Sequence, residues 1–182
     1  MEKKEIRKLV FQRRKEVSEA WQHEQTEKIC RQVIASEEFR KADTVFVYMD
    51  CKGEAGTKPV IEEAWRLGKK VAAPKIVGPT EMKFYYIHSY EDVEKGYFDV
   101  PEPTTGELAQ EEDALILVPG VAFDANRHRC GYGKGFYDRY LSAHPQHSTI
   151  AIAFDFQLLE EVPSDEFDVL PQKIITEKRV IC

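Results

Sequence analysis

Short apolar runs of the kind that form buried strands alternate along this chain with segments whose apolar residues recur at helical spacing. This alternation is the feature that most restricts the fold. We expect strands at residues 44–48, 70–74, 82–87, 114–119, 149–154 and 173–176. We expect helices at residues 3–17, after Ser18, briefly after Ser36, at residues 57–67 and at residues 136–142. Strands separated by helices pair in parallel, and helices then cover both faces of the sheet.

These elements predict one domain, residues 1–182, of the α/β class. We expect a three-layer α/β/α fold with an open, mostly parallel, Rossmann-like sheet and an N-terminal helical segment. Residues 114–119 are the most apolar run and should be central, whereas residues 88–112 are rich in proline, glycine and acids and should form a surface excursion. Ligands bind beyond the carboxyl ends of such strands, so the loops after residues 48, 118 and 154 form the candidate site.

The charge is uneven, and its pattern narrows the range of partners. Two basic islands, residues 1–15 and 127–139, interrupt an otherwise acidic chain with a net charge of −6. An acidic body argues against nucleic acid as a partner and favours small anionic ligands at the islands, although a basic run alone more often forms a solvated helix face. The chain shows no CxxC pair, no signal peptide and no membrane-spanning run. We expect a cytoplasmic protein with no membrane partner, and a monomer.

Residues 127–139 contain the strongest chemical signal, three glycines alternating at positions 131, 133 and 135 with Lys134 among them. Glycines let the backbone approach a ligand closely, and N–H groups beside a lysine suit a phosphate. The spacing fits neither the Walker A loop, which needs Ser or Thr after the lysine, nor the dinucleotide fingerprint, which needs glycine where Phe136 stands. A glycine alternation alone leaves open whether the loop binds phosphate or only forms a tight turn.

The surrounding sequence strongly resembles the 5-formyltetrahydrofolate cyclo-ligase family, also called 5,10-methenyltetrahydrofolate synthetase. Four separated blocks carry the resemblance over the whole length, in the right order. They are Lys3–Arg7, then Gly53–Glu54 with Thr57, then Leu117–Asp124 continuing through Asn126–Arg127 and Arg129–Leu141, and last Val162–Pro163 with Asp168 and Ile174–Glu177.

The resemblance implies conversion of 5-formyltetrahydrofolate to 5,10-methenyltetrahydrofolate with ATP and Mg²⁺, releasing ADP and phosphate. The formyl oxygen is a poor leaving group, so it is phosphorylated before N10 closes the ring, and phosphoryl transfer depends on positioning and charge neutralisation. Implied ATP contacts are Lys3, Lys4, Arg7, Arg129, Gly131, Tyr132, Gly133, Lys134, Gly135, Phe136 and Tyr137. Implied folate contacts are Met49, Glu54, Tyr132, Gly133, Lys134, Gly135 and Phe136. Lys134 and Arg129 would be catalytic, and Asp138 and Asp168 would hold Mg²⁺.

The chain also departs from the family pattern, and two other functions compete with the first. Ala55 and Gly56 replace a larger aliphatic residue and an acid, and Phe167 stands where relatives often have histidine. His128 lies outside the matched positions, and we expect a solvated loop residue. The alternatives are a non-catalytic folate- or nucleotide-binding module on the same scaffold and a phosphosugar isomerase-like protein. Retention of the phosphoryl-transfer and metal groups argues against the first, and the ATP and folate blocks argue against the second.

Overall fold

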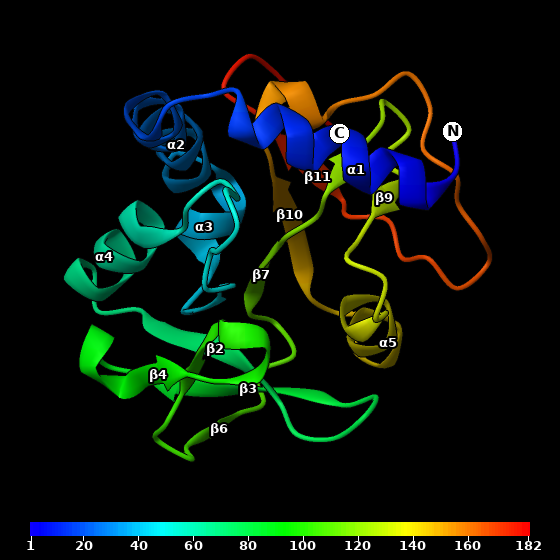
Figure 1. The fold of residues 1–182 in the computed structure, drawn as a ribbon. Coiled ribbons are helices and arrows are strands. Elements are labelled where there is room, and N and C mark those ends of the chain that lie inside the picture. Colours follow the sequence, from blue (N-terminus) through cyan, green and yellow to red (C-terminus); the bar gives the residue numbers. More distant parts are fainter.

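The computed structural model describes residues 1–182 and centres on an eight-stranded sheet of order β12-β11-β10-β7-β1-β2-β3-β6 (Figure 1). The strands are β1 (Thr44–Phe46), β2 (Lys70–Ile76), β3 (Met82–Ile87), β6 (Leu108–Ala109), β7 (Leu115–Val118), β10 (Ser148–Ile152), β11 (Lys173–Ile175) and β12 (Val180–Ile181). From β11 to β2 all neighbours are parallel, while β3, β6 and β12 each run antiparallel to the strand they join. The expected α/β fold with a mostly parallel sheet is confirmed.

All five expected helices form. They are α1 (Lys3–Lys15), α2 (Glu19–Ile34), α3 (Glu37–Lys41), α4 (Lys58–Arg66) and α5 (Phe136–Ala143). Ser18 and Ser36 cap α2 and α3 as predicted, because their hydroxyl oxygens accept the N–H groups of Trp21 and Phe39. Thr57 precedes α4 but does not cap it, since its hydroxyl donates to the Tyr48 carbonyl.

Two apolar cores lie on opposite faces of the sheet. Helices α2, α3 and α4 cover one face, where Val45, Leu115 and Ile150 point, and α5 covers the other, where Phe46 and Ile116 point (Figure 1). Odd and even positions of each strand therefore face different helices, as the period of two requires. Because β7 is buried on both faces, its four consecutive apolar residues read as an unbroken run in the sequence.

Helix α1 lies over the carboxyl ends of β7 and β10 rather than on a face of the sheet. A small apolar cluster joins Ile6 and Val10 of α1 to the hairpin formed by β8 (Ala122–Phe123) and β9 (Arg129–Cys130). The neighbouring Arg13 donates to the Phe156 carbonyl, 2.6 Å away, in the short 3₁₀ helix η3 (Asp155–Gln157). Helix α1 thus covers the start of the loop after residue 154, but residues 165–169 of the same loop line the cleft at this edge of the sheet, so the loop reaches the site as expected.

Residues 88–112 are more ordered than the expected surface excursion. They contain the 3₁₀ turns η1 (Tyr90–Asp92) and η2 (Tyr97–Asp99), a hairpin of β4 (Val93–Lys95) and β5 (Pro101–Pro103), and the edge strand β6. The carboxylate of Glu102 accepts the Ile76 N–H at 3.0 Å, which ties this hairpin to β2. The tip of the hairpin, η2, is thereby held beside the carboxyl end of the sheet. No helix of the protein is both long and apolar enough to cross a membrane.

Candidate functional site

A cleft of about 1210 Å³ lies at the carboxyl edge of the sheet. A site for one small molecule typically measures about 300–1,000 Å³, so this cleft has room for two ligands. The predicted site residues that line it are Lys3, Arg7, Met49, Glu54, Arg129, Gly131, Tyr132, Gly133, Lys134, Gly135, Phe136, Tyr137, Asp138 and Asp168. Lys4 is exposed and does not line the cleft, since it points away from the helix face that carries Lys3 and Arg7.

The segment from Gly131 to Gly135, here the glycine loop, connects β9 to α5 and uses backbone conformations that need glycine. Gly133 has φ of 100° and Gly135 has φ of 71°, both in the left-handed region. Gly135 is also the N-cap of α5. Two of the alternating glycines are therefore required by the turn itself, and this requirement is compatible with ligand binding.

The backbone N–H groups of the glycine loop are free, whereas two of its carbonyl groups are held by arginines. None of the N–H groups from Gly131 to Asp138 donates a hydrogen bond within the protein. Arg7 Nε donates to the Gly131 carbonyl at 2.7 Å, and Arg139 Nη2 donates to the Lys134 carbonyl at 2.7 Å. A run of free donors that ends in the first turn of a helix is suited to an anion, because the helix dipole adds to the attraction.

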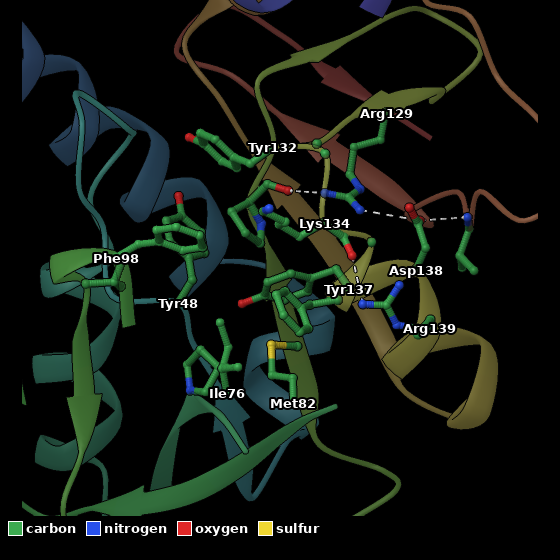
Figure 2. Close-up of a pocket in the computed structure, with 18 of the residues that line it drawn as sticks. Tyr48, Ile76, Met82, Phe98, Arg129, Tyr132, Lys134, Tyr137, Asp138 and Arg139 are labelled. Carbon is green, nitrogen blue, oxygen red and sulfur yellow. Dashed lines mark hydrogen bonds and ion pairs between the residues drawn. The ribbon is translucent and has the colours of Figure 1, made fainter. Parts of the chain in front are cut away.

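Two cations of different character lie beside this loop. Arg129 is 6% exposed; its guanidinium donates to the Pro119 carbonyl at 2.9 Å and lies 3.3 Å from Asp138 Oδ1. Lys134 is exposed, and its ammonium contacts only the ring of Phe98, 5.6 Å from the centroid. In Figure 2, Arg129 and Asp138 lie on one side of the cleft and Tyr132 and Phe98 on the other, with Lys134 between them. Arg129 is thus fixed in place, while Lys134 is free to follow a ligand.

The two predicted metal-binding carboxylates both line the cleft, and each already has a cationic neighbour. Asp138 accepts the Val169 N–H at 3.0 Å and faces Arg129. Asp168 Oδ2 is 3.0 Å from Lys3 Nζ. Burial would raise the pKa of Asp168, but the hydrogen bonds from Lys3 and the Asp165 N–H outweigh it and hold that pKa below its usual value. No group of three or more His, Cys, Asp or Glu side chains gathers at one point to bind a metal.

Glu54 lies on the segment Asp50–Thr57, here the substrate loop, which follows β1. Its Oε1 accepts the Cys51 N–H at 2.8 Å, and its Oε2 accepts the hydroxyl of Tyr132 at 2.9 Å. Burial raises the pKa of Glu54 above its usual value, although these hydrogen bonds act in the opposite direction. The carboxylate is therefore held in one orientation at the edge of the cleft, where its remaining lone pairs can accept N–H groups of a ligand.

The residues Ala55 and Gly56, which depart from the family pattern, fit a substrate loop that packs tightly. Ala55 is buried, and its carbonyl accepts the hydroxyl of Tyr48 at 2.6 Å. A Cβ at Gly56 would come 3.2 Å from a methyl group of Thr26 in α2, and the Gly56 N–H donates to the hydroxyl of the same threonine. The departure thus reflects close contact with α2, and it leaves Glu54 at the cleft.

Residues 88–112 supply a cleft residue that the sequence did not indicate. Phe98, at the tip of the hairpin, lines the cleft, is 53% exposed and has φ of 57°, which is uncommon for a bulky side chain. The ammonium groups of Lys52 and Lys134 both lie within 6 Å of its ring, at 5.9 and 5.6 Å. The pair Tyr97–Phe98 directly after Gly96 was the available signal, but a surface excursion gave no reason to place it at the site.

His128 and Phe167, which lie outside or depart from the family pattern, differ in their surroundings. His128 is not simply a solvated loop residue, since its Nδ1 lies 2.8 Å from Oδ2 of the buried Asp124, which also accepts the Val162 N–H. It stabilises the β8–β9 hairpin and does not line the cleft. Phe167 does line the cleft and is 76% exposed, next to Asp168.

Known proteins that are similar to this chain in sequence and fold are all described as enzymes of one kind. Residues 1–177 match the 5-formyltetrahydrofolate cyclo-ligase family. A probable 5-formyltetrahydrofolate cyclo-ligase of Caenorhabditis elegans is 30% identical over 98% of this chain and 94% of its own. The 5-formyltetrahydrofolate cyclo-ligase of Escherichia coli K12 is 28% identical over 94% and 98%. The Aquifex aeolicus 5,10-methenyltetrahydrofolate synthetase structure gives a TM-score of 0.86 at 36% identity, covering 100% of this chain and 92% of that one.

Proposed function

We propose a reaction for the cleft from one premise: the chain belongs to the 5-formyltetrahydrofolate cyclo-ligase family and is an enzyme of that family. The proposed reaction converts 5-formyltetrahydrofolate to 5,10-methenyltetrahydrofolate, with ATP consumed to ADP and phosphate. ATP phosphorylates the formyl oxygen, the folate N10 attacks the formyl carbon, and phosphate leaves as the five-membered ring closes.

The row of free N–H groups from Gly131 to Asp138 carries this proposal. It supports a polyphosphate site, because several unpaired backbone donors lie beside Lys134 and the buried Arg129. Glu54 borders the same cleft and supports a folate site, since an oriented carboxylate can accept N–H groups from the pyrimidine edge of a pterin. The cleft volume accommodates both ligands together.

The side chains supply positioning and charge neutralisation rather than a covalent intermediate. Lys134 has no ion-pair partner, so its ammonium is available to the transferring phosphoryl group. Arg129 is held by the Pro119 carbonyl and can stabilise the same charge without rearranging. The flat faces of Tyr132 and Phe98 line the side opposite Arg129, where an aromatic ligand can pack.

Asp138 and Asp168 fit Mg²⁺, because magnesium in nucleotide sites usually takes one or two carboxylates together with phosphate oxygens and water. Both carboxylates line the cleft, and their present cationic neighbours, Arg129 and Lys3, occupy positions suited to positive charge. When bound, Mg²⁺ would neutralise charge on the nucleotide phosphates. Cytoplasmic location and a monomeric state stay predictions.

The direct test is to mix purified protein with ATP, Mg²⁺ and 5-formyltetrahydrofolate and to follow the near-ultraviolet absorbance of the methenyl product. We expect product only when all components are present, with one ADP released for each methenyl group formed. Folate binding without product would favour the non-catalytic binding module. Absence of both binding and product would contradict the proposal outright.

A further inference from the structure

Arg14, near the end of α1, is a buried arginine that joins three segments behind the cleft. It is 5% exposed and does not itself line the cleft. Its Nη1 donates to the Lys52 carbonyl of the substrate loop at 3.2 Å and to the Tyr132 hydroxyl of the glycine loop at 3.0 Å. Its Nη2 lies 3.4 Å from the Gly120 carbonyl, beyond β7. One guanidinium thus contacts both loops that form the site.

The contact with Arg14 fixes the direction of the next hydrogen bond. An arginine can only donate, so the Tyr132 hydroxyl accepts from Arg14. The single hydroxyl hydrogen of Tyr132 is then free to donate to Glu54 Oε2, 2.9 Å away. Because Glu54 Oε1 accepts the Cys51 N–H, both carboxylate oxygens are held, and the chain Arg14–Tyr132–Glu54 sets the orientation of the carboxylate.

This chain of side chains is also the direct hydrogen-bonded link between the two loops. The Tyr132–Glu54 bond is the one hydrogen bond that joins residues 50–57 to residues 131–135. Gly53 of the substrate loop packs against Arg14 so closely that a Cβ there would lie 3.3 Å from the arginine Cβ. Displacement of Arg14 therefore changes the substrate loop through two independent contacts.

The burial of Arg14 has to be explained by the groups that its guanidinium bonds. Burying a guanidinium is costly unless its donors are used, and here Nε has no partner. An apolar side chain would fill the same space beside Phe11, whose ring lies 5.5 Å from the guanidinium carbon, without that cost. An apolar residue would supply none of the hydrogen bonds to the Lys52 and Gly120 carbonyls and the Tyr132 hydroxyl, and of these only the bond to Tyr132 leads on to Glu54.

We propose that Arg14 is a positioning residue for the folate substrate, acting through the Tyr132 hydroxyl to hold the Glu54 carboxylate in its binding orientation. The inference rests on the proposed function, because it requires folate to bind at Glu54. In this proposal Arg14 does not contact ATP. The loss of Arg14 should therefore raise the KM for folate and leave the KM for ATP close to its original value.

A double-mutant cycle on the full-length protein tests this inference. Arg14→Met and Tyr132→Phe are each expected to raise the KM for 5-formyltetrahydrofolate about tenfold, the effect of losing one hydrogen bond to a charged group. The double variant should raise this KM no further than Arg14→Met alone, rather than a hundredfold, because Tyr132→Phe breaks a chain that Arg14→Met has already broken. Arg14→Lys keeps the charge and one donor, so it should recover part of the loss.

Arg13→Met is the matched control, because Arg13 is adjacent on α1 but donates to the Phe156 carbonyl and touches neither loop. It should leave the KM for folate within about twofold of the original value, whatever it does to thermal stability. If Arg14→Met does not fold, the cycle is run with Arg14→Lys. An active wild type with additive variants, or with equal rises in both KM values, overturns the inference alone. An inactive wild type instead contradicts the proposed function.

Discussion

The substrate loop and the glycine loop meet at the same cleft, but their backbone groups are satisfied differently. In the substrate loop four of the eight backbone N–H groups are bonded: Cys51 donates to the Glu54 carboxylate, Glu54 to the Cys51 carbonyl, Gly56 to Thr26 and Thr57 to Asp50. In the glycine loop only carbonyl groups are held, by Arg7 and Arg139, and the N–H groups remain free.

This difference matches the two kinds of ligand that we propose. A pterin presents a fixed pattern of donors and acceptors, so a rigid carboxylate can distinguish it from other rings. A polyphosphate presents many equivalent oxygens, so free donors and a flexible lysine serve it well. Changes in the substrate loop should therefore alter folate recognition, whereas changes in the glycine loop should alter turnover.

The largest effect should come from Lys134→Ala on the glycine-loop side. Removal of one group that stabilises transition-state charge typically lowers kcat about 10²- to 10³-fold. The Kd for folate should change much less than kcat, since Lys134 forms no hydrogen bond with the substrate loop. Turnover from methenyl absorbance and binding from equilibrium titration separate the two quantities. The exposed Lys75→Ala is the control, and equal losses of kcat and folate affinity in Lys134→Ala would show that the two loops do not divide these tasks.

Asp138→Asn should give the next largest effect, a weaker affinity for Mg²⁺. The Mg²⁺ concentration for half-maximal activity should rise about ten- to a hundredfold, the range for disturbed metal sites. The amide still accepts the Val169 N–H, so the start of α5 and thermal stability should be preserved. A magnesium titration at saturating ATP measures the change, with the exposed and remote Asp113→Asn as control. An unchanged titration curve would remove Asp138 from the metal site.

Glu54→Gln tests the substrate loop through its stability. Burial raises the pKa of Glu54, so the folded protein binds the carboxyl proton more tightly than the unfolded chain does. The stability that this proton contributes is lost as pH rises through the pKa of Glu54 in the folded protein. The neutral amide should therefore raise Tm at about pH 8, and this gain should vanish as pH approaches about 4.5. At pH values where the variant stays folded, its affinity for folate should be about tenfold lower than that of the original protein.

Thermal melts across pH measure the Glu54→Gln effect, and exposed Glu24→Gln on α2 is the control because its carboxylate has solvent around it. A Tm gain that is independent of pH would mean that ionised Glu54 does not oppose folding. Unchanged folate affinity would separate the buried carboxylate from recognition and would remove the functional contrast between the two loops.

Much of the fold could be predicted because its signals are local. The six expected strands all form, since runs such as residues 114–119 are apolar on both faces and could only be buried. The caps at Ser18 and Ser36 involve residues three positions apart. The edge strands β6 and β12, with two residues each, are too short to show any periodicity. The course of residues 88–112 depends on the distant contact between Glu102 and Ile76.

In the candidate site, too, local signals could be predicted and distant contacts could not. The glycine loop is contiguous in the sequence, so its glycines and Lys134 could be recognised together. Arg14 could not, because its hydrogen bond to Tyr132 spans 118 positions and its helix reads as a solvated basic face. Phe98 was hidden in a polar segment for the same reason. Residues that act through contacts between distant elements are visible only when the fold has brought those elements together.

The smallest effect should separate two adjacent lysines that the sequence treats alike. Lys3 lines the cleft and its ammonium lies 3.0 Å from Asp168, whereas Lys4 is exposed and lies outside the cleft. Lys3→Ala should therefore raise the KM for ATP several-fold, about 1 kcal/mol of lost electrostatic attraction. Lys4→Ala should change it less than twofold, because a solvated charge outside the cleft is screened. Initial rates over a range of ATP concentrations give the KM of each variant. Equal effects of the two variants would show that the general positive charge of α1, rather than a contact within the cleft, attracts the nucleotide to the glycine-loop side.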